Sequence, residues 1–183
     1  MNYIFLLLAA GFFGWGMVTY NRLVRLRTLM EGAWADIDVQ LTRRHDLIPN
    51  LVAAVKGYAG HEQATLKAVT ALRDQAEKLD SPARLGQVET QLQGAVMRLL
   101  AVKEAYPELM ASQNFMELQQ DLVDVEDHLQ YARRFYNGAV RDFNTAVGSI
   151  PDALVARAFL FRPAEFFQAE EGERAAPRLE MES

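Results

Sequence analysis

Cysteine is absent from this 183-residue chain. Its absence excludes disulfide bridges and thiolate metal sites, and it also excludes a lipid anchor attached to a cysteine. Basic residues are in the minority, since 19 Lys and Arg stand against 24 Asp and Glu and give a formal net charge of −5. Nucleic-acid-binding domains are usually basic, so this balance disfavours a nucleic-acid partner.

Motifs that mark common catalytic and cofactor sites are also missing. The chain has no GxGxxG, no P-loop and no GxSxG sequence. His61-Glu62 begins like a zinc-protease helix, but Thr65 stands where that motif needs its second histidine. The other histidines, His45 and His128, have no ligand spacing. We therefore expect no catalytic residues, no cofactor and no metal.

One acidic run is the remaining candidate for a cation site. It consists of Asp121, Asp124, Glu126 and Asp127. On a helix these side chains point in several directions, because successive residues turn around the axis. A solvated helix surface is therefore the favoured interpretation, and a hard-cation site is the alternative.

A nearly unbroken apolar run extends from Tyr3 to Tyr20. In a helix it would be about 27 Å long, close to the ~30 Å hydrocarbon core of a bilayer. The run predicts a transmembrane anchor over residues 1–21. Its candidate bilayer contacts are Tyr3, Leu7, Gly11, Gly14, Trp15 and Tyr20. The alternative is a cleaved signal peptide, which needs a basic segment before the run and a small-residue cleavage site after it.

Basic residues next to the run predict its orientation. Arg22, Arg25 and Arg27 follow it directly. The positive-inside rule then places the bulk of a single-pass protein of the inner (cytoplasmic) membrane on the cytoplasmic side. The same arginines are candidates for contact with anionic lipid headgroups.

Small residues within the run suggest a helix–helix contact. Ala10 and Gly14 have the small-xxx-small spacing that lets membrane helices approach closely. Glycine is also common in membrane helices without any such role. The second interpretation is favoured for this motif taken alone.

Helical periodicity continues beyond Tyr20 without a glycine or proline that would create a hinge. The expected buried positions are Leu23, Leu26, Met30, Trp34 (or Ala33), Ile37 and Leu41. Pro49 removes a backbone donor, so we expect a kink or a short break at 47–50. Gly57 and Gly60 weaken the helix further along, where a looser turn is plausible.

Later segments also have helical patterns. Ser81-Pro82 is a helix start signal, and the helix it opens should run to about Ala105. Residues 115–139 carry a heptad pattern, which favours coiled-coil-like packing. A short helix is expected over 152–159. The chain should therefore be all-α: the membrane helix continues into an antiparallel bundle of three long helices and a short C-terminal one. The bundle domain covers 22–168, and an acidic tail over 169–183 should be disordered.

Several blocks resemble the LemA family of bacterial membrane proteins. They are NRLVRLR and AWADIDVQLTRRHDLIPNLVAAVKGYAGHE, then AVKEAYPELMASQNFMELQQDL, ARRFYNGAVRDFNTAVGSIP and FRPAEFF. The likeness covers roughly 20–167. It implies a membrane-tethered helical bundle and no agreed enzymatic role. A relative takes part in building magnetosome membranes, and family members are often encoded beside a membrane zinc protease.

The densest resemblance falls on charged residues around the proline. They are Arg43, Arg44, Asp46, Pro49 and Asn50. One interpretation is ordinary surface ion pairs worth about 0–1 kcal/mol. The other is that this segment shapes the kink and a contact surface.

An aromatic-rich segment near the C-terminal end also has two interpretations. Its residues are Phe159, Phe161, Phe166 and Phe167. They either close the core of the bundle or form an exposed patch for a membrane or a neighbouring subunit.

These features favour a membrane-anchored, non-enzymatic scaffold that self-assembles and organises membrane or membrane proteins. The alternative is an adaptor or regulator of a membrane protease or sensor, with a membrane metalloprotease as the possible partner. A hydrolytic or metal enzyme is the least favoured class. The expected partners are the bilayer and further copies of the chain.

Overall fold

The computed structural model describes residues 2–59 and 62–167, and in these ranges every regular element is helical. The helices are α1 (Asn2–Tyr58), α2 (Gln63–Ala76), α3 (Pro82–Ala101), α4 (Pro107–Met110), α5 (Gln113–Gly148) and α6 (Asp152–Ala158), with a 3-10 turn η1 (Val102–Glu104) after α3. The expected all-α class is confirmed. His61 and the tail over 169–183 lie outside the described residues.

The chain divides into two compact units. Unit 1 combines Met1–Val39 with Gln130–Glu165, and unit 2 combines Gln40–Leu129 with Phe166–Ser183. The helices α1 and α5 each contribute one part to each unit. The domain bounds expected from the sequence, at residues 22 and 168, stay a prediction.

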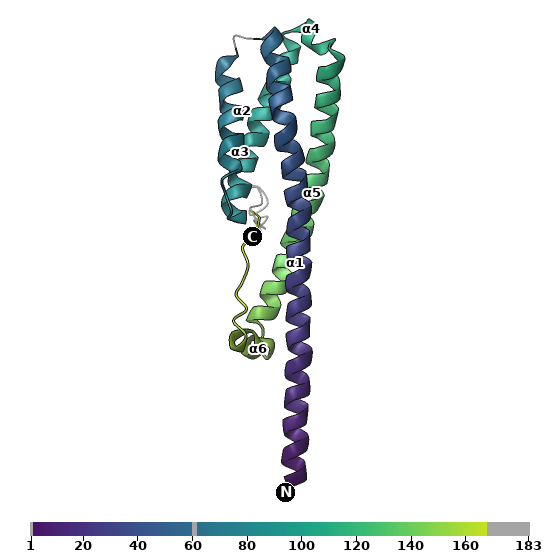
Figure 1. Ribbon diagram of the computed structural model, residues 1–183, viewed down its shortest axis with the longest axis vertical. Coiled ribbons are helices and arrows are strands. Elements are labelled where there is room, and N and C mark those ends of the chain that lie inside the picture. The colour runs from purple at the N-terminus through teal and green to yellow at the C-terminus, as the bar shows by residue number, and fades with distance from the viewer. Residues whose placement is uncertain (1, 60–61, 168–183) are drawn as a thin grey trace, which may run out of the picture. The chain divides into compact units, whose positions relative to one another are not determined.

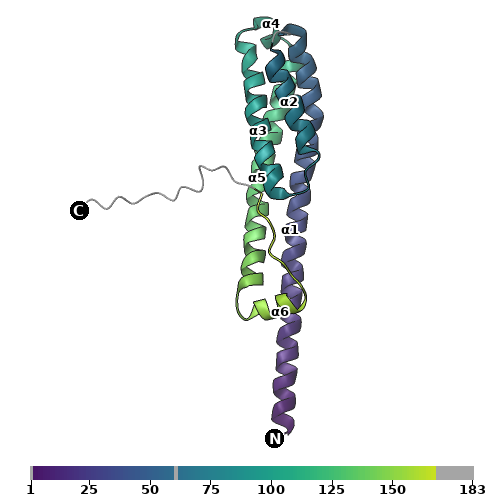
Figure 2. The ribbon, with the colours of Figure 1, turned by 90° about the vertical axis from the view of Figure 1, so that its left-hand side faces the viewer.

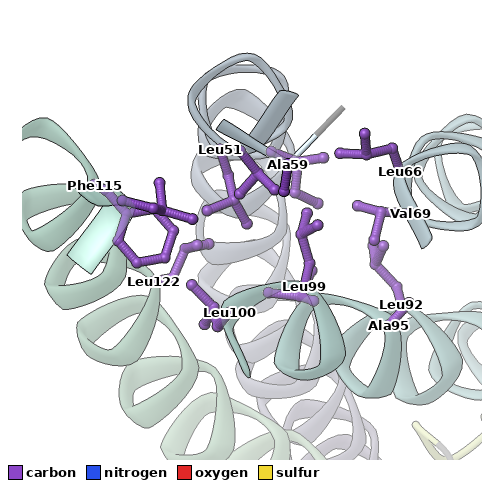
Figure 3. Packing of buried hydrophobic residues seen from close by; sticks show 14 residues of the cluster. Leu51, Ala59, Leu66, Val69, Leu92, Ala95, Leu99, Leu100, Phe115 and Leu122 are labelled. Atoms are coloured by element: carbon purple, nitrogen blue, oxygen red, sulfur yellow. The ribbon is translucent and has the colours of Figure 1, made fainter. Parts of the chain in front are cut away.

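Unit 2 is an antiparallel bundle. The later part of α1, then α2, α3 and the earlier part of α5 run in alternating directions, with α4 at the turn before α5 (Figure 1). Their apolar side chains point toward one another in one core (Figure 3). The largest fully buried members of that core include Leu51, Leu92, Leu99, Leu109 and Phe115. Burial of such a side chain stabilises the fold by about 1.5–3 kcal/mol.

Helix ends in unit 2 follow local sequence signals. The hydroxyl of Ser81 accepts a hydrogen bond from the backbone N–H of Arg84, and Pro82 occupies the first turn of α3. Near Gly57, where a looser turn was expected, the helix ends completely: α1 stops at Tyr58. A separate helix, α2, then begins at Gln63, so the bundle draws on one more helical segment than the three long helices expected.

Unit 1 contains the first part of α1, which packs against the end of α5 and against α6 from Trp15 onward. Helix α1 passes from Tyr20 to Asn21 without interruption, as expected. The predicted stripe faces the protein: Leu23, Ala33 and Ile37 are at most 2% exposed. Leu23 packs with Phe143 of α5 and with residues of α6 in one cluster.

The segment after α6 returns along α5 and is held there by hydrogen bonds. Asn144 donates to the backbone oxygen of Ala164 (2.9 Å) and accepts from its N–H (2.8 Å). The hydroxyl of Tyr136 donates to the backbone oxygen of Glu165 at 2.9 Å. Two of the blocks that resemble LemA, ARRFYNGAVRDFNTAVGSIP and FRPAEFF, are therefore joined through α5 side chains.

The ionisation of Tyr136 should make the stability of the protein depend on pH in the alkaline range. Burial, and secondarily the negative charge of Glu165, raises the pKa of Tyr136 above its ordinary value of 10.0. In the unfolded chain the phenol ionises first, so the free energy of unfolding should fall as pH rises from about 10 through the raised pKa. Tyr136→Phe should lower the free energy of unfolding by about 1 kcal/mol at neutral pH, because a hydrogen bond is lost. The difference from wild type should shrink above pH 10, since Phe cannot ionise.

Urea unfolding of the full chain in mild detergent, at neutral and alkaline pH, measures both effects. Tyr131→Phe is the matched control on the same helix, because the Tyr131 side chain is 68% exposed. A constant difference between wild type and Tyr136→Phe at every pH would contradict the assignment of the titration to Tyr136.

Candidate functional site

The N-terminal part of α1 presents a bare apolar surface. From Tyr3 to Phe13 its large apolar side chains are 62–82% exposed, including Leu7 at 74%. An 18-residue window of this helix has a mean hydropathy of 1.6, and 6% of the window is buried. By length and composition, α1 is the one candidate membrane span among the described residues. This is consistent with membrane anchoring.

The expected anchor residues do not all have the same surroundings. Tyr3 and Leu7 are exposed, and an added side chain at Gly11 or Gly14 would meet no other atom within 4 Å. Trp15 instead packs against the core cluster of unit 1. The protein therefore begins to cover the helix inside the predicted span.

The arginines after the span are on the surface. Arg22 donates to Asp152 at the start of α6 at 2.8 Å, and Arg27 donates to Glu31 one turn along α1 at the same distance. Arg25 is exposed. All three remain accessible to a charged surface, because even the paired side chains of Arg22 and Arg27 are more than half exposed.

A buried ionic cluster lies in unit 2 and includes Arg44 and His45 from the stretch of densest family resemblance. Glu89 of α3 is 0% exposed. Its carboxylate accepts from Arg44 Nη1 at 3.3 Å, and its other oxygen lies 2.7 Å from His45 Nε2. The same Arg44 nitrogen lies 3.3 Å from Glu126 of α5. One buried arginine therefore connects three helices.

Pro49 does not break the helix. Of the kink or short break expected at 47–50, the break is therefore wrong, and the kink stays a prediction. Helix α1 continues through Pro49 to Tyr58. A proline cannot donate to the carbonyl four residues earlier, which here belongs to His45. Arg73 of α2 donates from Nε to that carbonyl oxygen at 3.0 Å. The lost helix bond is thus replaced by a bond to another helix, and an unsatisfied buried carbonyl is avoided.

The other charged residues of this stretch face outward. Arg43 donates to Asp121 of α5 at 3.3 Å, and both side chains are about half exposed. Asp46 and Asn50 are exposed as well. The stretch therefore combines an inward face, formed by Arg44 and His45, with a surface face.

Sequence reasoning missed the partners of this cluster. Glu89 stands between Leu85 and Leu92 at gaps of four and three residues, so it lies on the apolar stripe of its helix. A carboxylate in that position is a sign of a buried pair, because Glu is rarely buried alone. Arg73 and Glu126 carry no comparable signal, since their roles depend on which helices are neighbours.

The aromatic segment near the end of unit 1 is partly covered. Phe161 is half-buried in the core cluster and contacts the ring of Phe143 edge-on at 6.3 Å. Phe159 is 60% exposed, and its ring lies 4.7 Å from that of Tyr20. In unit 2, Phe167 is buried and Phe166 is 47% exposed. The four phenylalanines thus divide between core and surface.

The acidic run is engaged with neighbouring side chains. Asp121 pairs with Arg43, Glu126 pairs with Arg44, and Asp124 accepts from Gln120 at 2.9 Å. Within 2–59 and 62–167, no group of three or more His, Asp or Glu residues has the geometry to hold a metal ion.

Comparison with known proteins finds a family model and several relatives that match the chain. The LemA family model matches residues 33–181. Protein LemA of Metamycoplasma hominis is 26% identical over 176 residues, which cover 93% of this chain and 79% of that protein. Magnetosome protein MamQ 2 of Paramagnetospirillum magneticum is 24% identical over 178 residues, which cover 83% of this chain and 65% of that protein. The match thus spans under two thirds of the length of that magnetosome relative.

Fold and surface together define an all-helical protein with a candidate N-terminal membrane helix and a bundle held by a buried ionic cluster. The chain belongs to the LemA family. The resemblance read from the sequence is thereby confirmed.

Proposed function

We propose that this protein is a membrane-anchored, non-enzymatic scaffold that self-assembles and organises membrane or membrane proteins. The observation that carries the proposal is α1, one helix from Asn2 to Tyr58. Its first part exposes large apolar side chains, whereas its last part is built into the core of unit 2. The anchor and part of the bundle are therefore the same element.

The buried ionic cluster supports a structural role for the polar residues. Catalytic groups need access to substrate, whereas Glu89 is 0% exposed and is bonded to Arg44 and His45. Buried charges that are paired in this way connect helices and specify their arrangement. Within the charged family stretch, folding thus explains Arg44 and His45.

The relatives support the link to membranes. Two curated relatives from Paramagnetospirillum magneticum are named as magnetosome proteins. These names agree with the membrane link that the sequence resemblance implies, and the organising role is our proposal for this chain. Arg22, Arg25 and Arg27 favour the inner membrane with the bundle on the cytoplasmic side, where they meet anionic lipid headgroups.

Self-association is the testable core of the scaffold proposal. We expect the full chain in mild detergent to form particles whose protein mass is at least twice the 20.6 kDa of one chain. Light scattering coupled to gel filtration, over a range of concentrations, measures this mass. Gly14→Leu should shift the particles toward the monomer if the small residues of the span make the contact, because a leucine keeps helix backbones apart. A strictly monomeric particle at all concentrations would contradict self-assembly.

The adaptor alternative gives a different result in the same membranes. Co-purification of one different membrane protein in a stoichiometric amount, a metalloprotease for example, favours an adaptor. Recovery of further copies of this chain alone favours the scaffold.

A further inference from the structure

The length of bare helix in unit 1 is too short for a bilayer. Large apolar side chains are exposed from Tyr3 to Phe13, and Met17 and Val18 are still 68% and 70% exposed, but one side of the helix is covered from Trp15 onward, because Trp15 packs on the core cluster and Thr19 is 3% exposed. The part before Trp15, about twelve residues, extends only about 18 Å, compared with ~30 Å of hydrocarbon. A helix that crosses the bilayer must therefore also place in the hydrocarbon those residues of α1 that other parts of unit 1 already touch.

The part that touches it is α6. Both views place α6 beside α1, with the N-terminal part of α1 bare beyond it (Figure 1, Figure 2). Val155 of α6 shares a cluster with Leu23 and Trp15, and Phe159 directly after α6 contacts Tyr20. If residues 15–20 lie in the bilayer, α6 lies at the same depth.

The surface of this region matches that position. Ile150, Leu154, Phe159 and Leu160 are 86%, 60%, 60% and 78% exposed, although they surround a seven-residue helix whose other face is buried. A helix that is apolar on both sides is normally covered on both sides. Here the protein covers one side, and a lipid environment would cover the other.

The backbone after α6 supports the same conclusion. Leu160 has φ = 58°, in the left-handed region. Its N–H donates to the oxygen of Arg157 (3.3 Å), and that of Phe161 donates to the oxygen of Ala156 (2.9 Å), which together form the helix-ending motif that usually has glycine at this position. Leucine carries a steric cost there, and its exposed side chain gains nothing in water. A contact outside the chain would offset that cost.

A hollow lies between α1 and α6. It has a volume of about 480 Å³, within the ~300–1,000 Å³ range of ligand sites. Its lining is apolar and includes Phe12, Phe13, Met17, Leu154, Ala158 and Phe159. Because this lining continues the exposed surface of the span, the occupant that fits is the acyl chain of a membrane lipid.

Basic residues lie close in sequence to the lining of the hollow, and they suit the headgroup of such a lipid. Arg25, Arg157 and Arg162 are exposed, and Arg22 is more than half exposed. Asp152 is paired with Arg22 and is largely covered, at 13% side-chain exposure. Between Ile150 and Arg162 the exposed charged side chains, Arg157 and Arg162, are both basic, which complements an anionic bilayer.

We propose that residues 150–160 form a second membrane contact, which lies in the bilayer interface beside the span and holds a lipid acyl chain against α1. The proposal rests on the proposed membrane anchoring. The second contact is a separate claim, because a protein held by the anchor alone would leave α6 in water.

The absence of native cysteine allows site-specific labels to test this contact. An environment-sensitive fluorophore is attached to Ile150→Cys or Leu154→Cys in the full chain, in vesicles of anionic and neutral phospholipid. Leu8→Cys reports the span, since Leu8 is 69% exposed. Met97→Cys in unit 2 is the aqueous control, matched to Leu154 in exposure at 62%. Quenching by nitroxide-labelled lipid is compared with quenching by iodide in the buffer.

We expect the labels at 150 and 154 to behave like the label at 8, with lipid quenching several-fold above that at 97. If the label at 8 is quenched by lipid while those at 150 and 154 respond to iodide as 97 does, the second contact is overturned and the anchor stands. If the label at 8 also responds to iodide, the anchor itself fails. Shielding of 150 and 154 from both quenchers that increases with the protein-to-lipid ratio would assign this surface to another copy of the chain instead.

Discussion

Replacement of Glu89 by Ala should lower the free energy of unfolding by about 3–5 kcal/mol, because breaking a buried ion pair leaves its partner uncompensated. Glu89 is fully buried and bonds both Arg44 and His45. The deletion leaves a buried guanidinium whose one remaining carboxylate partner in the cluster is Glu126. Urea unfolding of the full chain in mild detergent measures the loss.

A neighbouring pair supplies the control. Arg43 and Asp121 are also 3.3 Å apart, but both are about half exposed. Asp121→Ala should therefore change stability by only about 0–1 kcal/mol, since exposed pairs contribute little. The double variant Arg44→Met with Glu89→Leu should lose less than Glu89→Ala alone, because it removes both charges of the pair. Equal losses of unfolding free energy for Glu89→Ala and Asp121→Ala would show that burial does not make the ionic cluster more important for stability than an exposed pair.

The apolar stripes could be predicted from the sequence because their period is local. Leu23 and Ile37 of α1 and Leu92 and Leu99 of α3 are all 0% exposed, as their spacing indicates. On α5, Phe115, Val125, Leu129 and Phe143 are likewise buried. Coiled-coil packing along that heptad pattern stays a prediction, because burial does not establish knobs-into-holes contacts.

The ionic cluster could not be predicted, because its members are distant in sequence. Arg44 and Glu89 are 45 residues apart, and Arg73 is 28 residues from His45. The expectation of a break at Pro49 failed for the same reason. The sequence shows that proline removes a helix bond, but it does not show that Arg73 will bond the released carbonyl.

The two sides of α6 show a further limit of prediction from the apolar pattern of the sequence. The sequence showed apolar residues at 154, 155 and 159 but not which of them the protein covers. In the structure Val155 is 7% exposed and Leu154 is 60% exposed. The choice between core and interaction patch for the four phenylalanines likewise has no single answer, since Phe167 is buried and Phe159 is 60% exposed.

A single arginine at Gly11 should weaken insertion of the span by about 2.5–3.5 kcal/mol, roughly a hundredfold in the membrane-to-water partition. Gly11 lies near the middle of Tyr3–Tyr20, and no atom lies within 4 Å of an added Cβ, so packing inside the protein is undisturbed. Apolar residues such as Leu or Phe favour insertion by only about 0.3–0.6 kcal/mol each. One central charge therefore offsets several of them.

Gly32→Arg is the matched control, since Gly32 is on the same helix, is equally open, and lies outside the apolar run. Both changes replace glycine by a better helix former, so any gain in helix propensity cancels in the comparison. Resistance of the full chain to alkaline carbonate extraction from membranes measures insertion. Wild type and Gly32→Arg should stay in the pellet, whereas Gly11→Arg should be largely extracted. Equal retention of both variants would mean that residues 3–20 do not cross the hydrocarbon core, and the second membrane contact at α6 would lose its basis together with the anchor.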